Sequence, residues 1–184
     1  MILPIVAYGD PVLKKEAEEI EKDYPFLKEL IENMYETMYK AEGVGLAAPQ
    51  IGKSIRLFVV DASPFDEEDK KLKGFKKTFI NPIIVEEHGK EWTFNEGCLS
   101  IPGVREDVIR QPEIVIEYQD EDFNLIEEKY TGIAARIIQH EYDHIEGILF
   151  TDKINPLKRR LLKTKLNNIS KGNVKVPYRM KFPK

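Results

Sequence analysis

The sequence contains one cysteine, one tryptophan and three histidines among its 184 residues. With Cys98 as the single thiol, no disulfide can form within the chain, so a special role for Cys98 has to be that of a thiolate or a metal ligand. No stretch approaches the ~20 consecutive apolar residues of a membrane-spanning helix. The first residues also lack the charged and apolar regions of a secretory signal. We therefore expect a cytoplasmic protein that makes no membrane contact.

Acidic side chains are missing from the end of the chain. From Lys153 onward there are 11 Lys/Arg and no Asp or Glu, whereas residues 1–152 hold 17 basic and 32 acidic side chains, a net charge of −15. This separation of charge indicates that the basic end meets a polyanion. We expect that contact to be electrostatic, without recognition of a nucleic-acid sequence.

The hydrophobic pattern predicts one α+β domain over residues 1–184, with a basic C-terminal helix and tail over 156–184. Helices are expected at 25–41 and at 131–147, the second bounded by Thr131 and Gly147, and a late helix at 155–172. Strands are expected at 54–62, at 78–87 paired with 90–94, and in a hairpin over 113–130. Residues 95–103 are expected to form a turn, and residues 173–184 to be frayed.

The segment "QHEYDH", residues 139–144, places two histidines four residues apart on a predicted helix. Because residues i and i+4 share a helix face, His140 and His144 can bind one metal ion, and Glu141, about 100° away, can touch a water on that ion. Ile133 and Ile137 continue the face toward an apolar pocket. The alternative is a buried helix with two hydrogen-bonded histidines and a surface glutamate.

A catalytic metal site requires three protein ligands and one open position. The third ligand could be Cys98, Asp143, His88 or an acidic residue elsewhere. Asp143 is better placed to orient a histidine, and His88 is expected in an exposed turn. Cys98 stands in a glycine-containing turn that could bring its sulfur to the helix. That position favours a ligand over the other common role of a lone cysteine, a small buried apolar residue.

Three separated motifs give the sequence a resemblance to the peptide deformylase family. The motifs "GVGLAAPQ" (43–50), "EGCLS" (96–100) and "QHEYDH" (139–144) stand in the order and spacing of that family's signatures, and the similarity covers roughly residues 3–155. The resemblance implies a mixed α+β fold, with antiparallel sheets packed around the HExxH helix. It also implies an enzyme that removes the formyl group from the N-formylmethionine of nascent polypeptides.

The resemblance further implies a metal centre and assigns its ligands. One divalent ion would be held by Cys98, His140 and His144, with water at the fourth position. The ion implied is Fe²⁺, which Zn²⁺, Ni²⁺ or Co²⁺ can replace. Glu141 would take a proton from the bound water and return it to the departing amine. The Gln50 side-chain amide and the Leu99 backbone N–H would bind the oxyanion.

Other residues are implied to contact the substrate. These are Val44, Phe94, Glu96, Gly97, Ile133 and Ile137 around the methionine side chain, Arg105 near the peptide, and Arg136, on the same helix, at the pocket rim. Gly43 and Gly45 would let the backbone approach an extended peptide that adds as a strand. Their alternative role is only to end the preceding helix.

Other functions stay open on the sequence alone. A zinc endopeptidase shares HExxH but usually takes its third ligand downstream, where only Glu146 lies near and no histidine follows. An inactive, ribosome-associated binding module is disfavoured, because Gln50, Glu141 and all three ligands are present. A nucleophile pair of Cys98 with a histidine would work without metal.

The basic end also has two interpretations. A helix over 156–170 would place Leu162, Leu166 and Ile169 on one side and basic side chains on the other. The outward charge favours a weak contact with ribosomal RNA phosphates, and the alternative is a helix that only covers the core. With such a contact, removing residues 172–184 is expected to weaken ribosome binding and to leave the turnover of a short formyl peptide unchanged.

Overall fold

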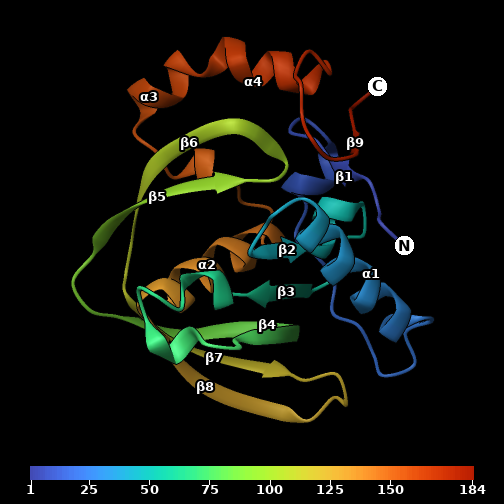
Figure 1. Ribbon diagram of the computed structural model, residues 1–184, viewed down its shortest axis with the longest axis vertical. Coiled ribbons are helices and arrows are strands. Elements are labelled where there is room, and N and C mark those ends of the chain that lie inside the picture. The colour runs from blue at the N-terminus through green and yellow to red at the C-terminus, as the bar shows by residue number, and fades with distance from the viewer.

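The computed structural model describes all 184 residues and has the HExxH helix, α2 (Gly132–Ile145), at its centre. Figure 1 shows α2 between a five-stranded sheet and a separate two-stranded ribbon. The other helices and strands, in chain order, are β1 (Ile5–Val6), α1 (Leu27–Lys40), β2 (Gly45–Ala47), β3 (Leu57–Asp61), β4 (Lys76–His88), β5 (Trp92–Cys98), β6 (Ile101–Arg110), β7 (Glu113–Gln119), β8 (Leu125–Thr131), α3 (Pro156–Leu161), α4 (Lys163–Ser170) and β9 (Met180–Lys181). None of the helices combines the length and the apolar character that crossing a membrane requires.

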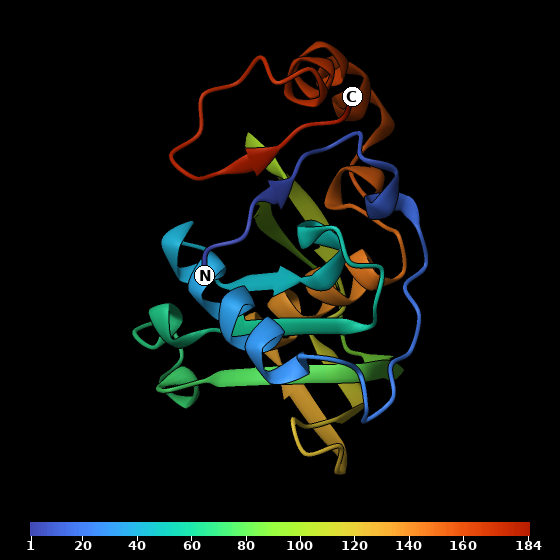
Figure 2. The ribbon, with the colours of Figure 1, turned by 90° about the vertical axis from the view of Figure 1, so that its right-hand side faces the viewer.

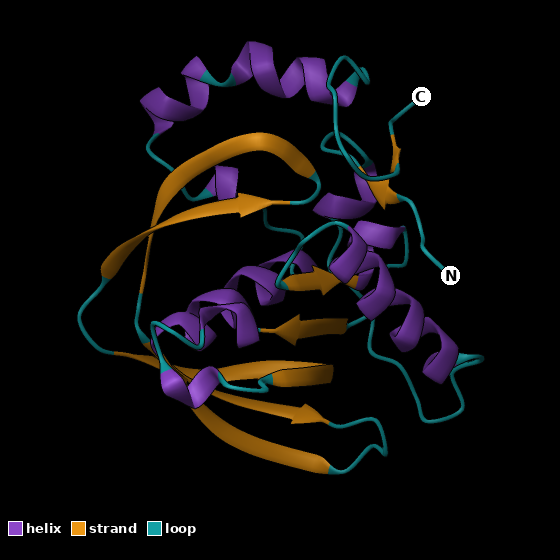
Figure 3. Cartoon of the chain, in the orientation of Figure 1, coloured by secondary structure: helices purple, strands orange, loops and turns teal.

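The five-stranded sheet has the order β2-β3-β4-β7-β8, and every neighbouring pair in it is antiparallel. β5 and β6 form the separate antiparallel ribbon, and β1 pairs in parallel with β9 (Figure 3). The predicted α+β architecture, with antiparallel sheets around the HExxH helix, is therefore confirmed. The predicted hairpin over 113–130 is also confirmed, as β7 and β8.

Apolar residues on both faces of β3 explain why the sheet is covered by a helix on each side. Successive side chains of a strand point to opposite faces. Phe58 and Val60 join the apolar cluster that contains α2, whereas Leu57 and Val59 join the cluster that contains α1. All four side chains are inaccessible to solvent. A continuous apolar run of this kind is typical of a strand buried on both faces.

The predicted start and end of α2 fall where the sequence placed them. Thr131 precedes the first helical residue, although its side chain makes no capping hydrogen bond. Gly147 follows the helix with φ 77°, a left-handed conformation that glycine adopts without steric cost. The predicted helix over 25–41 is likewise confirmed as α1.

Two expectations about the middle strands are wrong. Residues 78–87 and 90–94 do not pair with each other, because the second half of β4 pairs with β7 and β5 pairs with β6. β5 leaves the sheet and forms an antiparallel ribbon with β6 over Trp92–Cys98. Residues 95–98, expected in a turn, continue β5 up to Cys98.

The C-terminal region also differs from its prediction. The late helix occurs as two helices, α3 and α4, separated by Leu162, with Leu166 and Ile169 buried against the body as expected. Residues 173–184 are not frayed. Figure 2 shows the chain turning back after α4 so that β9 lies beside β1, and the backbone bonds Ile5 N–Arg179 O (3.0 Å) and Ala7 N–Lys181 O (2.9 Å) hold it there.

Candidate metal centre

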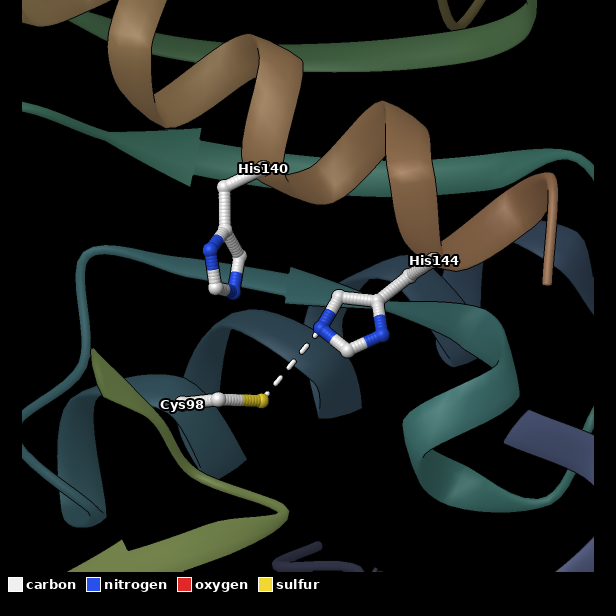
Figure 4. A group of neighbouring side chains, drawn as sticks. All are labelled: Cys98, His140 and His144. Carbon is white, nitrogen blue, oxygen red and sulfur yellow. Dashed lines mark hydrogen bonds between the residues drawn. The ribbon is translucent and has the colours of Figure 1, made fainter. Parts of the chain in front are cut away.

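Three side chains with metal-binding atoms converge where α2 faces the end of β5. The ligand atoms of Cys98, His140 and His144 all lie within 4.8 Å of one another. The Cys98 Sγ is 3.3 Å from the His144 Nε2, and Figure 4 shows both imidazoles extending from α2 toward the sulfur. His144 is 1% exposed, so the centre lies at the inner end of its cavity. These are the three donors that the resemblance implied, and Cys98 and His140 also line the cavity.

The turn between β5 and β6 brings Cys98 to the helix. The register of the ribbon shifts between Gly97 and Cys98, which is the mark of a β-bulge. A bulge redirects a side chain that regular pairing would point elsewhere. The turn is also anchored to the N-terminal strand, since the Tyr8 N–H donates to the Ser100 carbonyl at 2.8 Å.

Glu96 orients the first histidine. Its carboxylate accepts a hydrogen bond from the His140 Nδ1 at 2.9 Å, which leaves the Nε2 of that ring free to bind a metal ion. The same carboxylate accepts hydrogen bonds from Arg110 (2.8 and 3.0 Å) and Arg136 (2.7 Å). Arg110 in turn donates to Asp143 at 2.7 Å. Asp143, expected to orient a histidine, therefore pairs with an arginine, and Glu96 takes the orienting role.

The charges around the histidines favour a cation. Burial would raise the pKa of Glu96, but its hydrogen bonds with His140 and Arg110 outweigh burial and hold that pKa well below its usual range. Burial would likewise lower the pKa of His140, yet contacts with Cys98 and Glu96 raise it well above normal. Burial lowers the pKa of His144, which favours the neutral imidazole that a metal ligand requires. A divalent ion between these groups would supply the positive charge that Glu96 and the Cys98 thiolate attract.

Glu141 follows His140 on the helix and is held without a hydrogen-bond partner. Its side chain is buried, and its Oε1 has no partner in the protein. Burial raises the pKa of Glu141 to about 7. Gly45 lies directly against it, because a Cβ on this glycine would come within 2.8 Å of the Glu141 Cδ. The absence of a side chain at Gly45 therefore gives the carboxylate its place beside the ligands.

Gln50 and Leu99 lie on the other side of the sulfur. Gln50 is buried, accepts a hydrogen bond from the Ala47 N–H at 3.0 Å, and donates to Cys98 Sγ at 3.4 Å and to Ser100 Oγ at 3.2 Å. Leu99 lies between β5 and β6, and its N–H takes part in none of the backbone hydrogen bonds outside the strands. The Leu99 N–H is therefore available to a ligand oxygen beside the metal centre, whereas the Gln50 amide would first have to give up one of its two bonds.

The centre opens into a cavity of about 510 Å³. The predicted substrate residues that line it are Gly43, Val44, Gly45, Phe94, Glu96, Gly97, Arg105, Arg136 and Ile137, together with Gln50, Cys98, Leu99, His140 and Glu141. Two predicted positions differ. Ile133 packs against the core cluster and does not line the cavity, because it lies a full helical turn before Ile137. Arg136 is 2% exposed and pairs with Glu96, so it forms the inner wall rather than the rim.

Several residues of the site were missed by the sequence analysis. Arg110 completes the buried ion pairs, and Phe65, Lys175, Pro177 and Tyr178 line the cavity. The sequence analysis predicted no strand over residues 101–110, so nothing placed Arg110 in the interior. The tail residues follow no helical or strand period, so no sequence signal placed them at the site.

Comparisons with known proteins point to a single family. The family model described as polypeptide deformylase matches residues 2–160. Proteins named peptide deformylase from Christiangramia forsetii and Cytophaga hutchinsonii are 64% and 57% identical to this chain, over 100% of it and over 97% and 98% of their own lengths. The crystal structure of peptide deformylase from Thermus thermophilus has a TM-score of 0.83 at 41% identity and covers 94% of this chain and 99% of that one. The Ehrlichia chaffeensis peptide deformylase in complex with actinonin has a TM-score of 0.83 at 33% identity, with 95% and 99% coverage.

Replacing Glu96 with Gln should weaken metal binding by about 10- to 100-fold, the usual effect of losing a group that orients a metal ligand. The amide lacks the charge that holds His140, Arg110 and Arg136 together. Competition with a chelator at fixed pH measures the affinity. The control is Glu113→Gln, which removes only a surface ion pair with Lys129. Equal metal affinity in both variants would show that Glu96 does not orient the ligand.

Proposed function

This chain belongs to the polypeptide deformylase family, and from that premise we propose how its own residues remove the formyl group from N-formylmethionine at the start of nascent polypeptides. The family consists of metalloenzymes, and the three convergent donors with an unpartnered carboxylate beside them fit a catalytic ion. When bound by Cys98, His140 and His144, such an ion supplies an acidified water and an electrophile for the formyl oxygen. The convergence of those three ligands is the observation that supports the proposal.

The remaining steps belong to the side chains around the centre. Glu141 takes a proton from the attacking water at its unpartnered Oε1 and passes it to the amine nitrogen as the formyl C–N bond breaks and formate leaves, which its pKa near neutrality allows. The Leu99 N–H and the Gln50 amide donate to the formyl oxygen as it gains negative charge. The Gln50 amide can turn to that oxygen by giving up its 3.4 Å contact with the sulfur. One donor of this kind contributes about 2.7–4 kcal/mol to the transition state.

The peptide substrate can bind in extended form beside the cavity. β2 is the edge strand of the five-stranded sheet, so only β3 pairs with it. Gly43, Val44 and Gly45 line the cavity, and an extended peptide can add along this free edge. The methionine side chain would then lie against Ile137 and Phe94, with Arg105 near the following residues. Because nascent chains are the substrate, we propose that the chain works in the cytoplasm.

The other functions open on the sequence are less well supported. Glu146, the candidate third ligand of an endopeptidase, pairs with Arg56 at 3.1 Å instead of facing the centre. The Cys98 sulfur and the His144 ring are close enough for a nucleophile pair, but the His144 Nδ1 has no partner to orient it as a base. Membership in an enzyme family at 64% identity also disfavours an inactive binding module.

Hydrolysis should be confined to formylated peptides. The carboxylate of Glu141 lies directly against Gly45 beside the ligands, so we expect a site that fits a formyl hydrogen to reject the larger methyl of an acetyl group. We expect release of the free amine from formyl-Met-Ala-Ser and none from acetyl-Met-Ala-Ser. Casein serves as the endopeptidase control. Comparable turnover of the two peptides, or cleavage of casein, would contradict the deformylase mechanism.

The metal content of variants should distinguish the metal ligands from the base. Cys98→Ala and His144→Ala should lose tight metal binding, whereas Glu141→Gln should retain the ion and lose about 10²- to 10⁴-fold in kcat. Glu146→Gln, at the end of the same helix, is the control and should keep both the ion and turnover. A metal-free Glu141→Gln protein or a fully loaded Cys98→Ala protein would contradict the assigned roles.

We propose Fe²⁺ as the ion in the cell, since a thiolate with two imidazoles suits iron as well as zinc and nickel. An iron centre open to a cavity is accessible to oxygen. Iron-loaded protein should therefore lose activity in air, while protein loaded with nickel or cobalt should keep it. The comparison requires equal metal content at the start. Iron and nickel forms that survive air equally would argue against iron.

We further propose that the basic end makes a weak electrostatic contact with the ribosome. α3 exposes Lys158, Arg159 and Arg160, and Lys163 follows on α4. The first two are partly neutralised by Glu106 (3.6 Å) and Asp152 (3.2 Å), which leaves the last two without ion-pair partners. Figure 1 shows α3 and α4 on the opposite side of the ribbon from the sheet, where they can meet a large polyanion.

Replacing both Arg160 and Lys163 with Gln should reduce co-sedimentation with ribosomes at low salt. Each lost phosphate contact should lower the salt slope by about 0.7–0.9 log units per log unit of salt. The matched control replaces the exposed Lys22 and Lys28 near α1, and the turnover of a short formyl peptide should stay unchanged in both. If the Arg160 and Lys163 double variant binds ribosomes as well as the control variant, or if its binding does not depend on salt, then α3 and α4 only cover the core.

A further inference from the structure

The last segment of the chain forms one wall of the active-site cavity. Lys175, Val176, Pro177 and Tyr178 all line it, although they follow α4, the last helix of the chain. Tyr178 stands two residues before β9, whose pairing with β1 fixes where the segment lies. The tail is therefore a built part of the site and not a loose end beside it.

One hydrogen bond joins this wall to the turn that carries the catalytic groups. The Tyr178 hydroxyl donates to the Leu99 carbonyl at 2.6 Å. Tyr178 and Leu99 are both partly buried against the same apolar cluster, so water competes little for this bond. The bond reaches across 79 positions of sequence, and it is the only side-chain hydrogen bond recorded for Leu99.

The turn at Leu99 is held from three sides. Gln50 donates to Ser100 Oγ at 3.2 Å, and the Tyr8 N–H donates to the Ser100 carbonyl at 2.8 Å. The Leu99 side chain lies against Gly43, where an added Cβ would come within 2.7 Å of the leucine Cδ1. These contacts restrain Ser100 and the Leu99 side chain, but only Tyr178 binds the Leu99 carbonyl directly.

We propose that Tyr178 is a positioning residue for deformylation, because its hydroxyl holds the Leu99 carbonyl and thereby aims the Leu99 N–H at the formyl oxygen. The proposal rests on the function assigned above. A donor contributes most when it is aligned before the charge develops. Without the hydroxyl, the Leu99 backbone can rotate about its own φ and ψ and lose this alignment. Residues 172–184, expected from the sequence to be dispensable for turnover, then take part in it.

Tyr178→Phe removes the hydroxyl and keeps the ring that lines the cavity. The matched control is Tyr35→Phe, which removes a hydroxyl bonded to Thr78 at 2.9 Å in the core beneath α1. Both variants are loaded with the same metal and assayed on formyl-Met-Ala-Ser. Tyr178→Phe should lower kcat by about 3- to 10-fold, the scale of one neutral hydrogen bond, with KM and metal content unchanged. Tyr35→Phe should leave kcat unchanged even where it lowers Tm.

A second measurement does not depend on activity. In the zinc-loaded protein, ¹⁵N relaxation should show a lower order parameter for the Leu99 amide in Tyr178→Phe than in the parent or in Tyr35→Phe. An unchanged order parameter, or a kcat equal to that of Tyr35→Phe, overturns the proposal. An inactive parent protein would contradict the proposed function, and the relaxation comparison would still decide whether Tyr178 holds Leu99.

Discussion

The buried carboxylate of Glu96 connects the parts of the metal centre. It lies on β5, two residues before Cys98, and it binds His140 and Arg136 on α2 and Arg110 at the end of β6. Removing one partner from such a buried ion pair typically costs about 3–5 kcal/mol, because a charge is left uncompensated. The carboxylate therefore fixes the distance between the strand that carries the sulfur and the helix that carries the imidazoles. The geometry of the three ligands follows from this connection.

The sheet provides the rigid support for α2. β3 is buried on both faces, and the apolar side of α2 packs on one of them. This packing fixes the rotation of the helix, so His140 and His144 face the ribbon while Glu141 turns toward Gly45. The helix supplies two ligands and the base, so the ribbon has to bring only the third ligand, Cys98. Function depends on how the ribbon docks, and the ion pairs of Glu96 determine that docking.

Local sequence patterns were sufficient to predict the metal centre but not the strands and side chains around it. The helix, its two histidines and Glu141 could be predicted because helical periodicity acts within a few residues. Cys98 could be favoured because its turn stands in a motif of known spacing. The pairing of β5 with β6 could not be predicted, since β4 pairs over its second half with β7, a strand more than 20 residues further along the chain. The position of Tyr178 depends on the pairing of β9 with β1, which joins the two ends of the chain.

The sequence analysis identified charged residues of the site but did not place all of them correctly. Arg136 was expected at the pocket rim because it lies on the same helix as the ligands, but two carboxylates in the interior stabilise Arg136 and Arg110 there. Asp143 was expected to hold a histidine because it is adjacent to one in sequence. Its distance to Arg110, 2.7 Å, shows that neighbours in space decided the pairing.

The central claim is that one ion binds to the sulfur of Cys98 together with His140 and His144. Titration of the metal-free protein with Co²⁺ under nitrogen, followed by absorption spectroscopy, tests it most directly. The account predicts one Co²⁺ per chain, a thiolate-to-cobalt charge-transfer band, and the intense visible bands of a four-coordinate site. Cys98→Ser should lose the charge-transfer band. A full cobalt load without that band in the parent protein would contradict the account.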